Sequence, residues 1–141
     1  MAKSVHDALW EWMQRCEGIS RLFFNFSGAE SGDTVIGTAG DTIIEEYIDG
    51  SQLRRYSFEL IRYLPYTTRE NDDGNVAMLD EVESIAEWIR ERNEAGELPA
   101  LPPGCSAGSV TVLENYMGYV AAQGEDRAKY MMPIAMDYMK G

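Results

Sequence analysis

The segment Asp41–Leu64, DTIIEEYIDGSQLRRYSFELIRYL, decides the fold because its pattern is typical of one long β-hairpin. Asp49 and Gly50 stand between two strand-like runs, the strongest short-range signal for a two-residue type I′ turn. Both central residues of that turn need a positive φ, which glycine adopts freely and aspartate more readily than most residues. Counting outward from the turn predicts the cross-strand pairs Ile48–Ser51, Tyr47–Gln52, Glu46–Leu53, Glu45–Arg54, Ile44–Arg55 and Ile43–Tyr56.

The base and the tip of this predicted hairpin differ in character. The base has one apolar face, typical of a strand that packs on a core, formed by Ile43, Tyr56, Phe58 and Leu60. Toward the tip, apolar and charged side chains are mixed on both faces, which suits neither a core nor plain solvent. A hairpin alone is marginally stable in water, so we expect the tip to pack on another subunit. The residues expected at this contact are Glu45, Tyr47, Leu53, Arg54 and Arg55. A twisted hairpin with solvated Glu–Arg pairs explains the same pattern without a partner.

Composition places narrow bounds on the class of protein. The 141 residues suit a single domain, residues 1–141, which is large enough to bury a core without disulfides. The net charge of −12 argues against a protein that grips nucleic acid by its phosphates, and against binding to anionic membranes. The two cysteines, Cys16 and Cys105, have no metal-type spacing. The N-terminal residues form an amphipathic pattern unlike a signal peptide, and no apolar run reaches transmembrane length, so we expect a protein made in the cytoplasm.

The rest of the chain predicts helices and strands in alternation, and therefore an α+β domain with a mostly antiparallel sheet. An N-terminal helix, Val5–Glu17, and a central helix, Val76–Ala95, flank the sheet. Trp10 lies well off the apolar stripe of the first helix, and we add it to the expected subunit contact. The remaining predicted segments before the second helix are a strand at Arg21–Phe26 and a loop at Ser27–Gly40 that includes a short strand at Thr34–Gly37 as an option. After it we predict a connector at Leu98–Ser109, a strand at Val110–Tyr119, a turn at Ala121–Arg127 and a strand at Ala128–Met139. Pro133 in the last strand lacks an amide donor, so this strand is expected to lie at an edge or to carry a bulge.

Two segments resemble sites of chemistry without meeting their requirements. Gly104–Gly108, GCSAG, matches the nucleophile elbow of hydrolases, but the elbow needs a strand before it, a helix after it and a later histidine. Arg69–Asp80 partly resembles a calcium loop, but it begins with a cation where a carboxylate is required. His6 is the single histidine and is expected to be solvated. We therefore predict no catalytic residues, no metal site and no cofactor, and a protein that is not an enzyme.

An ordered set of segments resembles a known family of phage proteins. The set consists of ALWEWMQRC in the first helix, YIDGS at the hairpin turn, AEWIRERNEAGELPALPPG from the second helix onward, VTVLENYMGY, and DRAKYMMPIAMDYM in the last strand. Together they resemble the tail-completion or minor capsid proteins of tailed phages and prophages of Firmicutes-type bacteria, which are related to tail terminators. No single motif is specific, and the order of the segments carries the resemblance over nearly the whole chain.

The resemblance implies a structural protein of the virion tail, without catalytic residues. Such proteins form a ring, usually of six copies, at the head-proximal end of the tail. The ring ends polymerisation of the tail tube protein and contacts the head–tail connector. DNA passes through the lumen without specific binding, which an acidic protein suits because like charges repel. Glu46 and Asp49, with Glu45 as a further candidate, are possible lumen-facing acidic residues, although solvated charge beside a turn explains them equally well.

The charge alone leaves a second function open. An acidic binding module, for example a DNA mimic that blocks a nucleic-acid-binding protein, would present a row of carboxylates to a basic partner. Its affinity for that partner would fall with salt. The sequence therefore carries two hypotheses, a tail-completion protein and an acidic mimic.

Overall fold

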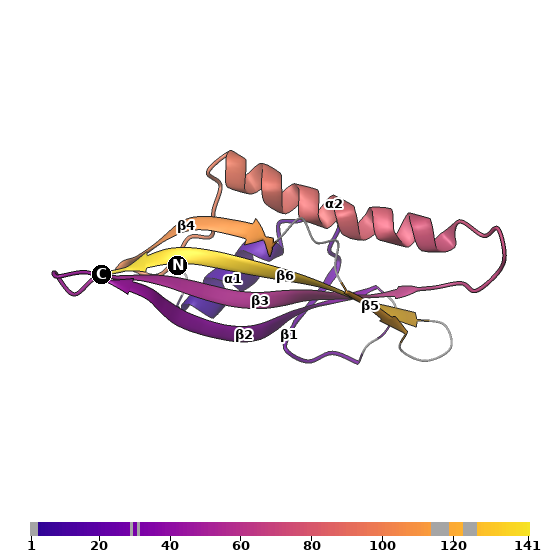
Figure 1. The fold of residues 1–141 in the computed structure, drawn as a ribbon, viewed down its shortest axis with the longest axis horizontal. Coiled ribbons are helices and arrows are strands. Elements are labelled where there is room, and N and C mark those ends of the chain that lie inside the picture. Colours follow the sequence, from indigo (N-terminus) through magenta and orange to yellow (C-terminus); the bar gives the residue numbers. More distant parts are fainter. Residues whose placement is uncertain (1–2, 29, 31, 114–118, 123–126) are drawn as a thin grey trace.

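Two paired strands, β2 (Asp33–Glu46) and β3 (Gln52–Pro65), each of 14 residues, form the long axis of the structure. The computed structural model describes residues 3–28, 30, 32–113, 119–122 and 127–141 (Figure 1). The strands run nearly the full length of the molecule, and the hairpin loop lies at one end of it (Figure 1). The other elements are α1 (Val5–Met13), β1 (Arg21–Phe24), α2 (Gly74–Glu94), β4 (Cys105–Val112), β5 (Tyr119–Ala122) and β6 (Arg127–Lys140).

The strands form one mostly antiparallel sheet in the order β1-β2-β3-β6-β4, and β5 pairs with β6 beyond the end of β4. Only the pairing of β1 with β2 is parallel among the described strands. The predicted α+β fold is therefore confirmed, with its long hairpin, its N-terminal helix and its central helix.

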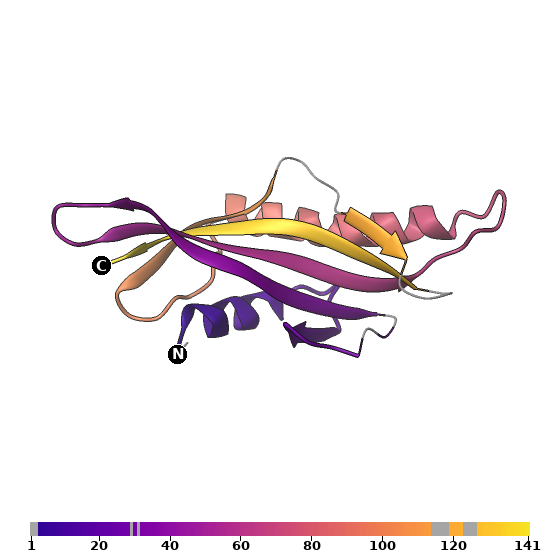
Figure 2. The same ribbon diagram turned by 60° about the horizontal axis from the view of Figure 1, so that its bottom comes forward.

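Both helices pack on the same face of the sheet, since their buried side chains share one core with the even-numbered residues of β3 and β6. Alternation along a strand places every second side chain on this face. The helices supply Leu9, Trp12 and Met13 from α1 and Val82, Ile85 and Ile89 from α2. Figure 2 shows the twist of the sheet along its strands. The strands supply Tyr56, Phe58, Leu60 and Leu64 from β3, and Tyr130, Met132, Ile134, Met136 and Tyr138 from β6.

The short strand predicted at Thr34–Gly37 lies within β2, but the rest of the second half of the predicted loop at Ser27–Gly40 is wrong, because β2 runs from Asp33 to Glu46. Its Gly and Asp residues have low strand propensity, but pairing with β1 on one side and β3 on the other holds them extended. The preceding strand is shorter than predicted and ends at Phe24. Asn25 then takes a positive φ of 66°, and Phe26 is left 85% exposed instead of sharing a face with Phe24.

The other element bounds differ less. α1 ends at Met13, four residues before the predicted Glu17. Cys16, which follows the helix, is nevertheless buried in the core. The predicted connector at Leu98–Ser109 is wrong from Cys105, where β4 begins. The predicted strand Val110–Tyr119 and the predicted turn Ala121–Arg127 fall partly on residues 114–118 and 123–126, outside the described residues.

Pro133 marks neither an edge strand, because β6 lies between β3 and β4 in the sheet, nor a bulge in the pairing with β3, which has no register shift. It pairs with Glu59 of β3 on one side. On the other side, the described pairing with β4 ends at Ile134 and that with β5 begins at Met131. The proline, which lacks an N–H, thus falls at a break between two ladders, where the cost of a missing donor is small.

Candidate interaction surface

The hairpin turn contains one residue more than predicted. The Gly50 N–H donates to the Tyr47 carbonyl at 2.9 Å, and the Tyr47 N–H donates to the Ser51 carbonyl at 2.8 Å. Gly50 has a φ of 89°, whereas Asp49 is not among the described residues with positive φ. This is a three-residue loop with a glycine bulge and not the type I′ turn, which requires positive φ at both central positions. The Asp–Gly pair fits both turns, so the dipeptide alone did not distinguish them.

The longer loop shifts the register of the predicted hairpin by one residue. Glu45 pairs with Leu53 instead of Arg54, and a second irregularity at Ile44 brings Ile43 opposite Arg54. Together the two irregularities move Ile43 from the predicted partner Tyr56 to Arg54, two residues nearer the turn. Ile43 thus stays on the face of Tyr56 but lies beyond the core to which it was predicted to belong, and it is 50% exposed.

Four large apolar side chains gather at the exposed end of the hairpin. We define the hairpin tip as residues 43–51. Within it, Ile44 is 48% exposed, Tyr47 is 39% exposed, and Ile48 at the apex is fully exposed, in addition to Ile43. Exposed apolar side chains that stand singly are ordinary, but a group at one projecting end is typical of an interaction site. Of these four residues, sequence reasoning had selected only Tyr47, because the assumed register gave Ile43 to the core.

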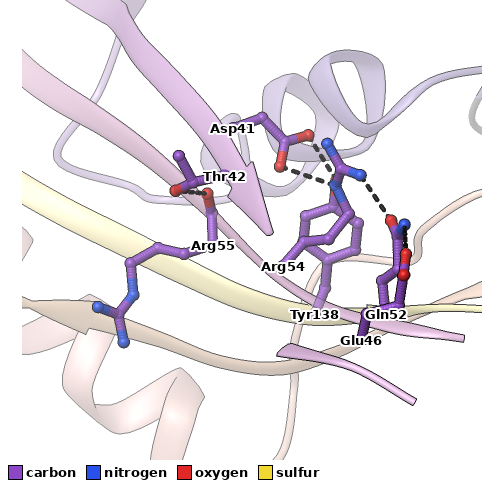
Figure 3. A network of polar contacts seen from close by, with 7 residues as sticks. All are labelled: Asp41, Thr42, Glu46, Gln52, Arg54, Arg55 and Tyr138. Carbon is purple, nitrogen blue, oxygen red and sulfur yellow. Dashed lines mark hydrogen bonds and ion pairs between the residues drawn. The ribbon is translucent and has the colours of Figure 1, made fainter. Parts of the chain in front are cut away.

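The side chains just below the tip form a continuous polar network (Figure 3). The Tyr138 hydroxyl donates to Asp41 at 2.6 Å, and the Arg54 guanidinium donates to the same carboxylate at 3.2 Å. Arg54 also donates to Gln52 at 2.7 Å, and Gln52 donates to Glu46 at 2.8 Å. Burial, together with the nearby Asp41 carboxylate, raises the pKa of Tyr138 to about 12. The network ties β2, β3 and β6 together and fixes the direction in which the tip projects.

Arg55 lies on the other face of the hairpin. It forms a bidentate pair with Asp137 of β6, at 2.8 and 3.1 Å. Both arginines predicted at the subunit contact therefore have partners within the chain, Arg54 with Asp41 and Arg55 with Asp137. Leu53 is half-buried between its neighbours Glu45 and Met139.

The acidic residues predicted for the tip are exposed, and each accepts a hydrogen bond from a neighbour in the hairpin. Glu45 accepts from the Tyr47 hydroxyl at 3.3 Å, and Glu46 accepts from Gln52. The Asp49 carboxylate accepts from the backbone N–H and the hydroxyl of Ser51, and these bonds lower the pKa of Asp49. The tip is thus an apolar apex surrounded by carboxylates.

Trp10 lies far along the chain from the tip, on the side of α1 near β1. It is half-buried, and its ring is tilted against Phe24 at 6.5 Å between centroids. His6, one turn earlier, is exposed as predicted, and in addition its Nδ1 lies 2.6 Å from the Tyr56 hydroxyl. Its ring also meets Phe24 edge-on at 5.8 Å. The structure therefore leaves Trp10 and the hairpin tip as two separate surfaces.

The described residues give little material for other chemistry. Within them, no three His, Cys, Asp or Glu side chains are close enough together to hold a metal ion. No helix in the described ranges has the length and apolar character needed to cross a membrane. The GCSAG segment runs into β4 instead of forming a strand-to-helix turn, which is the wrong geometry for a nucleophile elbow. Searches with protein-family models and against curated protein sequences find no match to this chain.

Proposed function

We propose that the protein is a tail-completion protein of a tailed phage that forms a ring at the head-proximal end of the tail. The ring ends polymerisation of the tail tube protein and joins the tube to the head–tail connector. The observation that carries this proposal is the hairpin tip, where Ile43, Ile44, Tyr47 and Ile48 are exposed together at one end of the molecule. A protein that stays monomeric gains nothing from such a surface and loses solubility by it.

A ring of identical copies requires two different patches on each copy, which meet at every boundary between neighbours. The tip provides one patch, and it is held rigidly by the Asp41 network below it. Because the contact is between unlike surfaces, it closes into a ring or continues as a filament, and it does not stop at a dimer. The order of segments in the sequence supports the ring, with six copies as the expected number.

The charge of −12 suits a conduit for DNA, since phosphates and carboxylates repel each other. Glu46 and Asp49 are exposed at the tip and are the proposed lumen-facing residues. In this proposal the protein is made in the host cytoplasm, and its final location is the virion tail. Antibody labelling of intact particles should mark the head-proximal end of the tail.

A specific observation favours the acidic mimic as a second candidate. Exposed carboxylates lie along one side of α2, at the spacing of neighbouring helical turns, namely Asp80, Glu83, Glu87, Glu91 and Glu94. Two of them are partly neutralised within the chain, Glu87 by Arg90 at 3.0 Å and Glu91 by Arg92 at 4.0 Å. The mimic predicts binding to a basic partner that weakens with salt, and no rings.

The deciding experiment is to image the purified protein by negative stain and to measure its mass in solution over a range of concentrations. We expect closed rings from the wild-type chain and monomers from Ile48→Asp. The matched control is Val76→Asp, which places the same charge at another exposed apolar residue, on the first turn of α2 away from the tip. Rings should persist in the control. Monomers from the wild-type chain at every concentration would refute the proposal, and so would rings from Ile48→Asp.

A further inference from the structure

Two hollows flank Trp10 on the outer side of α1. The first, of about 340 Å³, is lined by Ser4, His6, Asp7, Trp10 and Phe24, and we call it the Trp10 groove. The second, of about 290 Å³, lies on the other side of the same ring and is lined by Gln14, Ile19, Ser20 and Leu22. The Trp10 ring is thus a partition between two open spaces, although its inner side packs against the core.

The walls of the Trp10 groove are held in place by contacts within the chain. His6 is held by the Tyr56 hydroxyl at 2.6 Å and by the edge of the Phe24 ring. Ser4 caps α1 by accepting from the Asp7 N–H at 3.1 Å. The Asp7 carboxylate in turn accepts from the Lys3 N–H at 3.0 Å. A groove whose walls are already fixed loses little conformational entropy when a side chain enters it.

We propose that the Trp10 groove receives the hairpin tip of a second copy of this chain, with Ile48 entering between the rings of His6, Trp10 and Phe24. This inference rests on the proposed ring and names its second patch. The apex of the tip is apolar and exposed to solvent, and the groove is an open space with aromatic walls. Burial of an exposed apolar side chain such as Ile48 stabilises a contact between copies.

The linings of this groove and of the larger one on the same chain each have a net charge of −1, so the positions of the charges distinguish them. The tip, residues 43–51, contains three carboxylates and no basic residue. A hollow of about 720 Å³ between the end of α1 and α2 is lined by three carboxylates of its own, Glu17, Glu87 and Glu91, beside two arginines. The Trp10 groove has one carboxylate, Asp7, and lies at the first turn of α1, where unpaired N–H groups attract negative charge. The exposed Lys3 stands at the same end of the helix, so an acidic tip is favoured here. In this contact Glu46 and Asp49 lie at the boundary between copies instead of facing the lumen.

The tip and the groove belong to different parts of the chain, so the contact repeats from copy to copy in one direction. Each copy inserts its own tip into the next copy and receives the tip of the previous one. This is the heterologous contact, between two different patches, that a closed ring requires. It also explains why Trp10, off the apolar stripe of its helix, remains partly exposed.

Photo-crosslinking tests this contact directly. Benzoylphenylalanine is placed at position 48, with the same residue at position 76 as the matched control, and assembled protein is irradiated, digested and analysed by mass spectrometry. We expect crosslinks between copies from position 48 to peptides within residues 3–26, and none of these from position 76. Rings whose position 48 crosslinks to other peptides, or to none, would overturn the groove and leave the ring intact. Failure of the wild-type chain to assemble would overturn both.

A charge variant gives an independent readout. Lys3→Glu should raise the concentration needed for half-assembly about two- to fivefold, the effect of one exposed ion pair. Lys3→Arg should leave it unchanged. Equal behaviour of the two variants would contradict the proposed docking of the acidic tip at this end of α1.

Discussion

The base and the tip of one hairpin lie in opposite environments. At the base, Phe58 is 1% exposed, enclosed by the core that both helices share with β3 and β6. At the apex, Ile48 is fully exposed. Apolar side chains are abundant at both ends, but only those at the base are buried within the monomer. The folding free energy therefore resides in the base, and the apolar character of the tip needs an explanation outside the monomer.

The largest effect on stability should come from the base. Phe58→Ala removes a fully buried aromatic ring and should lower the free energy of unfolding by about 3–5 kcal/mol. Urea denaturation followed by circular dichroism measures this change. A loss below about 1 kcal/mol would mean that the core at the base is poorly packed, and the contrast with the tip would disappear.

Much of the base could be predicted from the sequence because apolar side chains alternate there without interruption. Tyr56, Phe58 and Leu60 in β3 are buried as expected, and the same alternation buries the even-numbered residues of β6 from Tyr130 to Tyr138. Arg62 follows the same alternation onto the buried face, where it donates to Thr34 at 2.6 Å and pairs with Glu81. Alternation predicts which face of the sheet a residue occupies, but it does not predict the hydrogen-bond and ion-pair partners of a buried arginine.

The tip could be predicted only in outline. The sequence pattern predicts that apolar and charged side chains mix on both faces of the tip. It does not predict the register of the two strands, because Asp49–Gly50 fits two turns that differ by one residue. That difference, together with the irregularity at Ile44, brings Ile43 opposite Arg54, where it is exposed. The partner of Arg55, Asp137, comes from β6, and the hairpin sequence does not contain that pairing. The length of β2 was missed as well, because its extended backbone depends on neighbouring strands and not on local propensity.

A smaller effect is expected at the boundary between base and tip. Asp41→Ala removes the acceptor of both Tyr138 and Arg54 and should cost about 1–3 kcal/mol of unfolding free energy. It should also lower the pKa of Tyr138 from about 12 toward 10.0, incompletely because burial remains the largest cause of the shift. Phenolate absorbance measures the titration, and Tyr138→Phe identifies the signal. An unchanged titration would show that Asp41 has no influence on this hydroxyl.

The same tyrosines predict how stability depends on alkaline pH. Burial raises the pKa of Tyr56 and of Tyr138 to about 12, against 10.0 in the unfolded chain. Between these values the folded state binds more protons than the unfolded state, so stability is full below pH 10 and is lost as the pH rises to 12. Urea midpoints measured across this range should fall in the wild-type chain and fall less in Tyr138→Phe. A midpoint independent of pH would contradict the burial of both hydroxyls.

A substitution in the hairpin turn should change the free energy of unfolding less than Asp41→Ala does. Gly50 has a φ of 89°, and a Cβ added to it would meet no atom within 4 Å, so Gly50→Ala adds backbone strain without a clash. We expect a loss of about 1 kcal/mol. Gly40→Ala is the matched control, because Gly40 is equally open but has no positive φ. Equal effects of the two substitutions would contradict the glycine bulge at the turn.

The smallest effect on stability is expected at the apex, where it is most informative. Ile48→Asp changes a side chain that touches little of its own chain, and the free energy of unfolding should stay within about 0.5 kcal/mol of wild type. The measurement is the same urea titration used for Phe58→Ala. A large loss would show that the tip supports the monomer, and the argument from its exposure to a partner would then fail. If Ile48→Asp leaves the stability unchanged but abolishes assembly, the two ends of the hairpin have separate roles. Residues of the same two strands then determine folding at the base and association at the tip.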